Sequence, residues 1–469
     1  MRPAPVCALV CASLAALLGS CGSEPPSEVV AGCAAGAYRL DTGELLILSP
    51  GSEGTLRYRF VDGRSGRLFP QSRGELISGE GWDAREPLVV RLQCPDERTL
   101  QWQPARGGST RGSRLALRST STRFERDGLS FEARLVLPVG EPRALVVRGH
   151  GSERDAATLF APDQYLFPAH DIAVLVYDKR GTGASGGEYT QDFHVLAGDM
   201  VAAVAHARTL VPEDLPLGVF GGSQGGWIAP LAATRTRVDF VIASFGLAES
   251  PLAEDREEVQ SELRARGYGE DVLAKARQLT DATGKVMASK FESGYEELRA
   301  LEASFEGEPW LEGIEGEFTG QVLRYPAWIA RLVGPWYDVQ TSWNYDPVPV
   351  LRAVGVPMLW VLAGKDNEAP SDTTFAILRS LQAGPAQLDI ARFPNADHGI
   401  IEFRETPDGR QRLGHSRGYF DLLMHWARER TLAGTFGTAE LYPDPVAPGR
   451  STAADALPAA DSSSAGRLR

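Results

Sequence analysis

The stretch Val219–Ala233, VFGGSQGGWIAPLAA, places one serine, Ser223, between two pairs of glycines. An apolar run precedes this serine, and a run of small apolar residues typical of a helix follows it. The pattern G-x-S-x-G, here Gly221 to Gly225, is typical of a very tight turn between a strand and a helix. Side chains two positions from the serine would collide as the strand and helix close together, and glycine removes those collisions. The stretch therefore predicts a serine whose oxygen stands clear near a helix N-terminus, where free N–H groups favour developing negative charge.

The same pattern occurs a second time, from Gly183 to Gly187 around Ser185. The residues before it, DKRGTG, are polar, and the residues after it, GGEYTQD, do not have a helical pattern. Because only Ser223 lies between a strand pattern and a helix pattern, the sequence predicts Ser223 as the nucleophile and Ser185 as a loop residue.

From about Leu115 onward, apolar runs alternate with other elements. The segment TRFERDGLSFEARLVLP predicts a β-hairpin that turns at Asp127-Gly128. Five runs that read as buried strands follow, with the helical pattern AGDMVAAVAHARTLV between the second and third: ALVVRGHG, IAVLVYDKRG, LPLGVFGGS, VDFVIASFG and VPMLWVLAG. Such alternation predicts an α/β fold with a mostly parallel sheet covered by helices on both faces.

The segment Tyr177–Ser185, YDKRGTGAS, precedes the Ser223 turn, and together they resemble the α/β-hydrolase superfamily. The resemblance is closest to serine-aminopeptidase-like and acyl-transferase-like hydrolases, and it covers about residues 115–436 apart from an insertion. It implies the α/β-hydrolase fold, with a mostly parallel eight-stranded sheet flanked by helices and a helical cap over the active site. In that family the YDKRG loop is structural, so we expect Asp178 and Arg180 to hold the turn.

The order of a catalytic triad in this fold is serine, acid, histidine. Asp366 directly follows the strand pattern VPMLWVLAG, whereas the rival Asp372 lies further into the next predicted helix. His398 follows the pattern QLDIARF in a family-like ADHG context. Its rivals are His415, in the polar run before the last helix, and His425, inside that helix. The order therefore predicts Asp366 and His398 as the partners of the serine.

The mechanism expected from these residues is acyl transfer. His398 takes the proton of Ser223 as the serine attacks a carbonyl carbon, and Asp366 orients and stabilises the imidazole. The backbone N–H of Gln224 is one predicted oxyanion donor, and the resemblance implies that of Ser152 as the other. The predicted function is a serine hydrolase of carboxylic esters, thioesters or small amides, acting on a small acyl substrate. The alternatives are an aminopeptidase-like peptidase and a non-catalytic surface-binding lipoprotein on a hydrolase scaffold.

The N-terminus resembles an export signal. Met1-Arg2 is followed by PVCALVCASLAALLGSC, which is too short to span a bilayer and has the character of a signal-peptide core. The residues Leu18-Gly19-Ser20-Cys21 resemble the bacterial lipobox, which implies cleavage before Cys21 and lipidation of its thiol. The alternative is an ordinary secretory signal with an incidental cysteine. Gly22 resembles sorting to the outer membrane, so the expected location is the periplasmic face of that membrane, held by a lipid anchor.

The cysteine content, the motifs present and the net charge bear on the disulfides, cofactors and partners expected for the chain. After export, Cys33 and Cys94 remain, and they either form a disulfide or stay as two buried thiols. The sequence holds no CxxC and no HExxH, and its seven histidines are scattered, so we expect no metal and no cofactor. The net charge of −13 argues against nucleic acid as a partner, because phosphate binding needs a basic surface.

Changes in pattern divide the chain. Short apolar runs broken by glycine and proline predict a small all-β domain with no catalytic constellation, followed by a linker at residues 105–114. The predicted divisions are a signal peptide (1–20), a tether (21–36), the β domain (37–112), the first part of the hydrolase core (113–247), a helical cap (248–344), the second part of the core (345–436) and a disordered tail (437–469).

The insertion is rich in aromatic residues. These either line a substrate pocket or pack the cap onto the body, and the sequence leaves both readings open. The residues concerned are Trp310, Trp328, Trp336, Tyr337 and Trp343.

Overall fold

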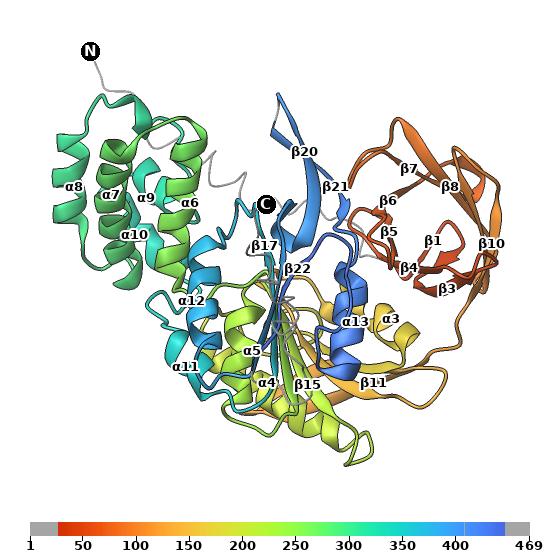
Figure 1. Ribbon diagram of the computed structural model, residues 1–469. Coiled ribbons are helices and arrows are strands. Elements are labelled where there is room, and N and C mark those ends of the chain that lie inside the picture. Colours follow the sequence, from red (N-terminus) through yellow and green to blue (C-terminus); the bar gives the residue numbers. More distant parts are fainter. Residues whose placement is uncertain (1–26, 408, 446–469) are drawn as a thin grey trace, which may run out of the picture.

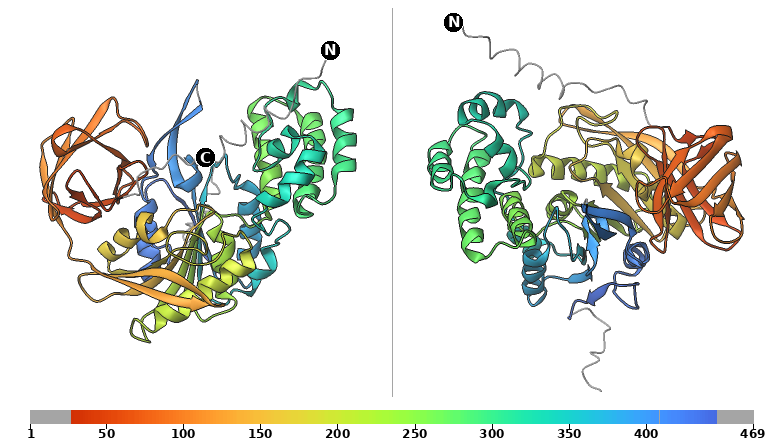
Figure 2. Two further views of the ribbon diagram at one scale, coloured as in Figure 1. Left: turned by 180° about the vertical axis from the view of Figure 1, so that it is seen from behind. Right: turned by 90° about the horizontal axis from the view of Figure 1, so that it is seen from above.

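The computed structural model describes residues 27–407 and 409–445 of the chain. The predicted signal segment and Cys21 lie outside these residues, as does the end of the predicted tail. Figures 1 and 2 show a central layered body with a β barrel on one side and a bundle of helices on the other. A hairpin of β20 (Ile401–Thr406) and β21 (Gly409–His415) stands between the barrel and the bundle.

A nine-stranded sheet forms the centre of the body. The strands β14, β13, β15, β16, β17 and β18 run parallel to one another, and β11, β12 and β22 pair antiparallel at the two edges. The fold class predicted from the sequence is confirmed, and β22 adds a strand to the expected eight. In sheet order the strands are β11 (Arg118–Arg126), β12 (Leu129–Leu137), β14 (Ile172–Tyr177), β13 (Ala144–Gly149), β15 (Leu217–Gly222), β16 (Phe240–Ser244), β17 (Met358–Ala363), β18 (Leu388–Phe393) and β22 (Glu440–Tyr442).

Both faces of this sheet are buried, which explains why its parallel strands are apolar at consecutive positions. Every residue of β14, IAVLVY, is buried, and the same holds for β16 and β17. Two apolar cores result, one with α4, α5, α11 and α12 and the other with α2, α3 and α13. The helices of the body are α2 (Ala157–Phe160), α3 (Asp163–Leu166), α4 (Phe193–Arg208), α5 (Gly225–Ala233), α11 (Val348–Ala353), α12 (Asp372–Gln382) and α13 (Tyr419–Glu429), with short 3₁₀ turns η1 (Ser72–Gly74), η2 (Pro168–His170), η3 (Pro309–Leu311) and η4 (His398–Ile400) along the chain.

The N-terminal region is a closed antiparallel barrel around an apolar interior. A disulfide joins Cys33 to Cys94, so of the two possibilities left open by the sequence the structure has the bridge. The barrel strands are β3 (Gly36–Leu40), β4 (Leu45–Pro50), β5 (Leu56–Phe60), β6 (Ser65–Pro70), β7 (Glu75–Gly79), β8 (Leu88–Asp96), β9 (Thr99–Pro104) and β10 (Thr110–Arg114), preceded by the small pair β1 (Val29–Val30) and β2 (Cys33–Ala34).

Two expected connectors are structured, which corrects the predictions for them. The residues 110–114 do not act as a linker, because β10 pairs with both β9 and β3 and closes the barrel. The predicted tether ends earlier than residue 36, because Val30 and Cys33 are already buried in the barrel core. In both places polar or small residues form strands because neighbouring strands supply backbone partners, which composition alone does not reveal.

The insertion after β16 folds as a helical bundle with its own core. Trp310 is fully buried inside this bundle, and Trp343 packs edge-to-face on Phe318. None of the described helices is long and apolar enough to cross a membrane. The bundle consists of α6 (Pro251–Ala265), α7 (Glu270–Ala288), α8 (Tyr295–Ser304), α9 (Thr319–Arg324) and α10 (Ala327–Tyr337).

The hairpin of β20 and β21, with β19 (Ala396–Asp397), was not foreseen from the sequence. It contacts the barrel through backbone hydrogen bonds, since the N–H of His415 donates to the carbonyl of Gly63 at 3.0 Å and the N–H of Trp82 donates to that of Arg412 at 2.8 Å. The hairpin therefore joins the N-terminal barrel to the C-terminal half of the body.

The chain also stays ordered past Gly437, where a disordered tail was expected. β22 pairs with β18, and Tyr442 packs against Phe375 of α12 at a ring distance of 5.0 Å. The predicted tail is thus corrected for residues 437–445, because Leu441 and Tyr442 find an apolar partner at the sheet edge. Residues 446–469 lie outside the described part of the chain.

Candidate active site

The turn predicted around Ser223 lies between β15 and α5. Ser223 has a φ of 51°, in the left-handed region that side-chain-bearing residues rarely adopt. A Cβ atom added at Gly221 would lie 1.9 Å from the carbonyl oxygen of Gly225, so no other residue fits at that crossing. The N–H of Ser223 donates to the carbonyl of Ser244 on the neighbouring strand at 3.0 Å, which fixes the turn against the sheet.

The structure brings Ser223, His398 and Asp366 together at the carboxyl ends of β15, β17 and β18. The Nε2 atom of His398 lies 3.2 Å from Ser223 Oγ, and its Nδ1 atom lies 3.0 Å from Asp366 Oδ2. The other carboxylate oxygen of Asp366 accepts the backbone N–H groups of Glu368 at 3.1 Å and Ala369 at 2.8 Å. This hydrogen-bonded chain has the geometry that nucleophilic acyl transfer needs, while the catalytic roles themselves stay predictions.

The environment of His398 favours its protonated form. Burial of the ring opposes ionisation, but the charge and hydrogen bond of Asp366 outweigh burial and raise the pKa of His398. Phe245 packs edge-to-face on the imidazole at 5.1 Å and shields one side of it. A histidine held this way accepts a proton readily from the serine.

The two predicted oxyanion donors come from different segments, Gln224 from the start of α5 and Ser152 from the loop after β13. Gln224 is the N-cap residue of α5, and among the described residues no acceptor bonds its backbone N–H or that of Ser152. Gly151 lies directly against the turn, since a Cβ atom added to it would sit 3.4 Å from Ser223 Cβ. The arrangement leaves both N–H groups free for a ligand, and their role as donors stays a prediction.

The second G-x-S-x-G segment has the structure of a loop. Ser185 Oγ donates to the carbonyl of Asp178 at 2.7 Å and accepts the N–H of Glu132 at 2.9 Å, so both of its hydrogen-bonding functions are used. The Asp178 carboxylate accepts the N–H of Thr158 at 2.9 Å and that of Ala184 at 3.1 Å. These contacts hold the loop closed, in the structural manner that the resemblance implied for Asp178.

Arg180 and the rival residues are also held by other partners. Arg180 forms two hydrogen bonds with Asp199, each 2.6 Å long. Asp372 pairs with Arg392 at the start of α12, His415 Nδ1 lies 3.0 Å from Ser65 Oγ in the barrel, and His425 contacts Phe436. None of these described contacts reaches the serine.

A rim of carboxylates beside His398 was not found from the sequence. Glu368 Oε1 lies 3.7 Å from His398 Nε2. Glu317 of the helical bundle interacts with the charge of His398, and Glu258 and Glu254 of α6 interact with Glu317 and Glu368. Burial, followed by the charges of neighbouring carboxylates, raises the pKa of Glu258 to about 8 and that of Glu317 to about 7, and also raises that of Glu254. One carboxylate oxygen of Glu258 is buried without a hydrogen-bond partner. The spacing of Glu254 and Glu258 places both on one face of α6, but nothing in the sequence connects that face to His398.

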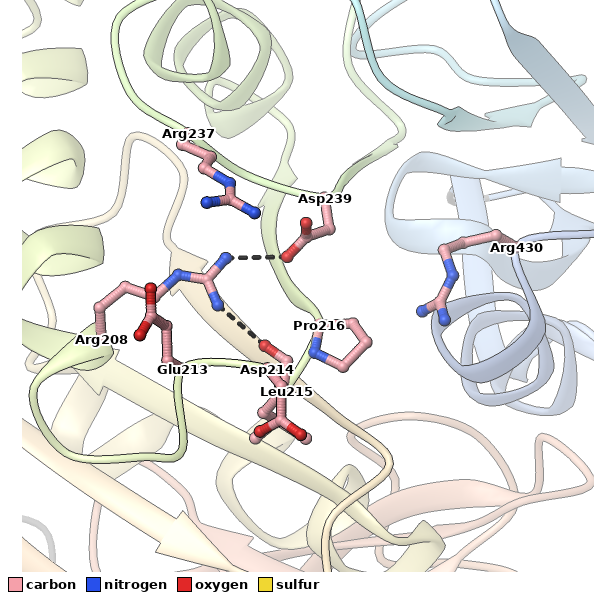
Figure 3. Close-up of a pocket in the computed structure, with 8 residues that line it drawn as sticks. All are labelled: Arg208, Glu213, Asp214, Leu215, Pro216, Arg237, Asp239 and Arg430. Carbon is pink, nitrogen blue, oxygen red and sulfur yellow. Dashed lines mark hydrogen bonds and ion pairs between the residues drawn. The ribbon is translucent and has the colours of Figure 1, made fainter.

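A cavity of about 210 Å³ lies elsewhere in the described part of the chain. Its lining residues, drawn in Figure 3, include Pro216 just before β15 and Asp239 just before β16, whereas Ser223 follows the other end of β15. Arg208 there donates to Asp239 at 2.8 Å and to the carbonyl of Leu215 at 2.8 Å. Asp239 also accepts the N–H of Leu217 at 2.7 Å, so these groups serve to join α4 to the strand ends.

Comparison with known proteins agrees with this fold. Residues 140–257 match the family model of serine aminopeptidase S33. An uncharacterised 31.7 kDa protein from the traX-finO intergenic region of Escherichia coli is 21% identical over 225 residues, which cover 47% of this chain and 72% of that protein.

Solved structures of two archaeal enzymes also resemble the chain. An esterase of Pyrococcus furiosus is 14% identical with a TM-score of 0.39, covering 61% of this chain and 84% of its own. An acylaminoacyl peptidase of Pyrococcus horikoshii is 14% identical with a TM-score of 0.38, covering 74% of this chain and 50% of its own. Likenesses this low carry no argument about what this chain acts on.

We predict that Asp366→Asn lowers the pKa of His398, because the substitution removes the charge that outweighs burial. Titration of the ring Cε1–H signal by NMR measures this pKa directly and needs no substrate. A raised pKa in the folded state also means that protonated His398 stabilises the fold at low pH, a contribution lost as pH rises through that pKa. Asp372→Asn serves as the control and should leave the signal unchanged. An unchanged pKa in Asp366→Asn would contradict the assignment of Asp366 as the partner of His398.

Proposed function

We propose that this chain, a member of the α/β-hydrolase superfamily, is a serine hydrolase that cleaves a carboxylic ester, thioester or small amide through an acyl-enzyme on Ser223. The observation that carries the proposal is the continuous hydrogen-bonded chain from Ser223 through His398 to Asp366. Its three members follow the carboxyl ends of β15, β17 and β18, and ligands of open α/β sheets bind at that edge of the sheet.

The steps follow from the positions of the atoms. His398 Nε2 accepts the proton of Ser223 as Oγ bonds to the carbonyl carbon, and the oxyanion that forms is stabilised by the N–H groups of Gln224 and Ser152. The protonated imidazole, stabilised by Asp366, then gives its proton to the leaving alcohol, thiol or amine. Water attacks the acyl-enzyme with the same histidine as base, which frees the acid and restores Ser223.

We also propose that the chain works outside the cytoplasm, held to the outer membrane by lipid on Cys21. The sequence pattern around Cys21 supports this location. The disulfide between Cys33 and Cys94 is consistent with an oxidising compartment.

We predict that Ser223→Ala lowers kcat/KM for p-nitrophenyl esters by about 10⁴-fold or more, because it removes the nucleophile. A fluorophosphonate probe should label wild type at Ser223, located by peptide mass spectrometry. The matched control is Ser185→Ala, which should keep the labelling, with circular dichroism to verify folding of both variants. Labelling at Ser185 would overturn the assignment of Ser223 as the nucleophile. A wild type that is neither labelled nor active on esters, thioesters or aminoacyl amides would favour the non-catalytic binding role.

A second candidate function, an aminopeptidase-like activity, is favoured by the carboxylate rim. Glu368 lies beside His398, and Glu258 and Glu317 add negative charge to this rim as pH rises through their raised pKa values, so a cation on the substrate would be attracted to it. A free amino group on the acyl side of the scissile bond is the cation that an aminopeptidase substrate carries. The same triad chemistry would then act on an amide instead of an ester.

We predict that the enzyme prefers the p-nitrophenyl ester of γ-butyrobetaine over its neutral analogue, in which carbon replaces the quaternary nitrogen. Because Glu258 and Glu317 have raised pKa values, they ionise as pH rises, so the preference should grow from about pH 6 to about pH 9. The quaternary cation itself does not titrate. The ratio of kcat/KM values measures the effect.

The double variant Glu258→Gln/Glu317→Gln should abolish the increase of this preference with pH. The control Glu270→Gln, on the outer surface of the bundle, should keep the increase. Equal rates on both esters at every pH would leave the ester or thioester hydrolase as the proposal.

A further inference from the structure

The helix α10 exposes large apolar side chains to solvent. Trp336 is 89% exposed, Trp328 is 69% exposed and Leu332 is 67% exposed. Their spacing of four residues places all three on one face of the helix. The sequence left two uses open for these aromatic residues, lining a substrate pocket or packing the cap onto the body. Neither use applies to this face, because side chains this exposed neither pack against the bundle nor line a closed pocket.

The opposite face of α10 is apolar as well. Ala330 and Gly334 are buried, and Gly334 lies so close to Phe291 that a Cβ atom added there would be 2.4 Å from the ring. A surface helix of a globular protein normally turns polar residues outward, and a helix that is apolar all round is buried. The outward face of α10 therefore has the composition of a contact surface that is uncovered in the isolated chain.

Charge on this segment differs from that of the rest of the chain. Residues 318–337 contain no aspartate or glutamate and carry two arginines, Arg324 and Arg331, both exposed, in a chain with 61 acidic residues and a net charge of −13. Tyr325, 49% exposed, and Tyr337, 60% exposed, extend the aromatic surface. Tryptophan, tyrosine and arginine are the residues that lie at the headgroup level of membranes, and here they follow one another from the end of α9 through α10.

The helix is also connected to the candidate active site by a short path. The segment after α10 contacts the loop before α4, where the N–H of Gln191 donates to the carbonyl of Val339 at 2.7 Å. In that loop, Tyr189 donates its hydroxyl proton to the carbonyl of Ser152, next to the serine turn. The segment after α10 is thus linked through one loop to Ser152, beside the serine turn.

We propose that the exposed face of α10, formed by Trp328, Leu332 and Trp336 and flanked by the exposed Arg324, Tyr325, Arg331 and Tyr337, docks onto a lipid surface that carries anionic headgroups. The aromatic rings lie at the headgroup level and the two arginines meet the negative charge. This docking is independent of lipid on Cys21 and of the catalytic proposal.

The test uses the chain from Gly22, which retains every described element and lacks the apolar N-terminal segment. Vesicles of phosphatidylcholine alone, and of phosphatidylcholine with phosphatidylglycerol, are sedimented with wild type and with Trp328→Gln/Leu332→Gln/Trp336→Gln. Wild type should bind the anionic vesicles, more weakly at high salt, and the triple variant should bind at least tenfold more weakly. Because the replaced side chains are exposed, activity on a soluble short-chain ester should stay unchanged.

The matched control is Val139→Gln/Leu210→Gln, which replaces exposed apolar residues outside α10 and should bind like wild type. Sedimentation velocity at several protein concentrations accompanies the binding assay. Equal binding of wild type and triple variant, or no vesicle binding by wild type, overturns the proposal. Self-association that the triple variant loses, without vesicle binding, overturns it in favour of a second copy of the chain.

A different observation concerns Lys179, which is buried with only 3% of its surface exposed. Its Nζ donates to the carbonyl of Gly151 at 2.6 Å, and its backbone N–H donates to His150 Nε2 at 2.9 Å. Asp178 and Arg180 on either side use partners other than this loop. Burial lowers the pKa of Lys179 to about 8, and both the ammonium and the amine keep an N–H to donate.

The peptide unit between Gly151 and Ser152 connects the Lys179 hydrogen bond to the direction of the Ser152 N–H. In the described part of the chain only the bond between Glu86 and Pro87 is cis, so the peptide bond between Gly151 and Ser152 is trans. In a trans unit the carbonyl oxygen and the N–H point in opposite directions. With the oxygen of Gly151 bonded to Lys179, the N–H of Ser152 is directed away from the lysine.

We infer that Lys179 is a positioning residue, which orients the Ser152 N–H toward the oxyanion by holding the carbonyl of Gly151. Tyr189 holds the next carbonyl, that of Ser152, so both oxygens flanking the N–H are bonded. This inference rests on the proposed function, because it concerns the oxyanion of that reaction.

The test compares Lys179→Met with wild type on a p-nitrophenyl ester and on the matching thiono ester, in which sulfur replaces the carbonyl oxygen. A misdirected donor should lower kcat/KM for the oxygen ester by about a hundredfold, as loss of an oxyanion donor does. The thiono ester gains little from that donor, so its rate should change far less. Lys179→Cys alkylated with bromoethylamine restores a terminal ammonium and should recover the oxygen ester rate.

A general structural defect would lower both rates equally, and that result, or no change, overturns the inference while leaving the hydrolase proposal intact. A wild type that neither hydrolyses the ester nor reacts with fluorophosphonate at Ser223 overturns the proposed function, and the positioning role with it.

Discussion

The left-handed turn at Ser223 sets the geometry of everything around it. A side chain in this region costs of order 1 kcal/mol or more, and the surrounding structure has to maintain it. The hydrogen bond from Ser223 to Ser244 and the close approach of Gly226 to Gly246 bind the turn to β16. Because the strand must reverse into α5 within one residue, the serine oxygen and the first free N–H groups of the helix lie on the same side.

The carboxylates near His398 differ in their hydrogen bonds. Asp366 is fully satisfied, since it bonds the imidazole with one oxygen and two backbone N–H groups with the other. No such hydrogen bonds hold Glu258 and Glu317 in the described part of the chain, and burial, followed by the charges of neighbouring carboxylates, raises their pKa values. The contrast separates a carboxylate bonded to the imidazole from carboxylates whose charge depends on pH.

Local patterns made the body, and the close approach of Ser223, His398 and Asp366, predictable. The apolar runs that form β13 to β17 are each buried on both faces. A continuous apolar run therefore indicated both the strand and its burial. Ser223, Asp366 and His398 each follow such a run, and their order along the chain is the order that the fold requires. The sequence also distinguished Ser223 from Ser185 by the elements that flank each residue.

The remaining features depend on partners that are distant in the sequence. The residues TRGSR of β10 have the composition of a linker, and they form a strand because β3 and β9 each offer a free edge. The carboxylate rim joins residues from α6, the segment before α9 and the loop after β17. The exposure of α10 follows from how the bundle packs, so the choice between a pocket and a packed face could not have been made from spacing.

The hairpin of β20 and β21 has a consequence for how this protein can be altered by recombination. Its residue Arg410 lies 3.0 Å from Asp397, the neighbour of His398, and donates to the carbonyl of Lys365, the neighbour of Asp366. Its last residue, His415, bonds Ser65 of the barrel across 350 positions of the chain. The barrel therefore could not be exchanged for a foreign domain by itself. That domain would also have to fit the hairpin, whose other end contacts the loops that carry Asp366 and His398.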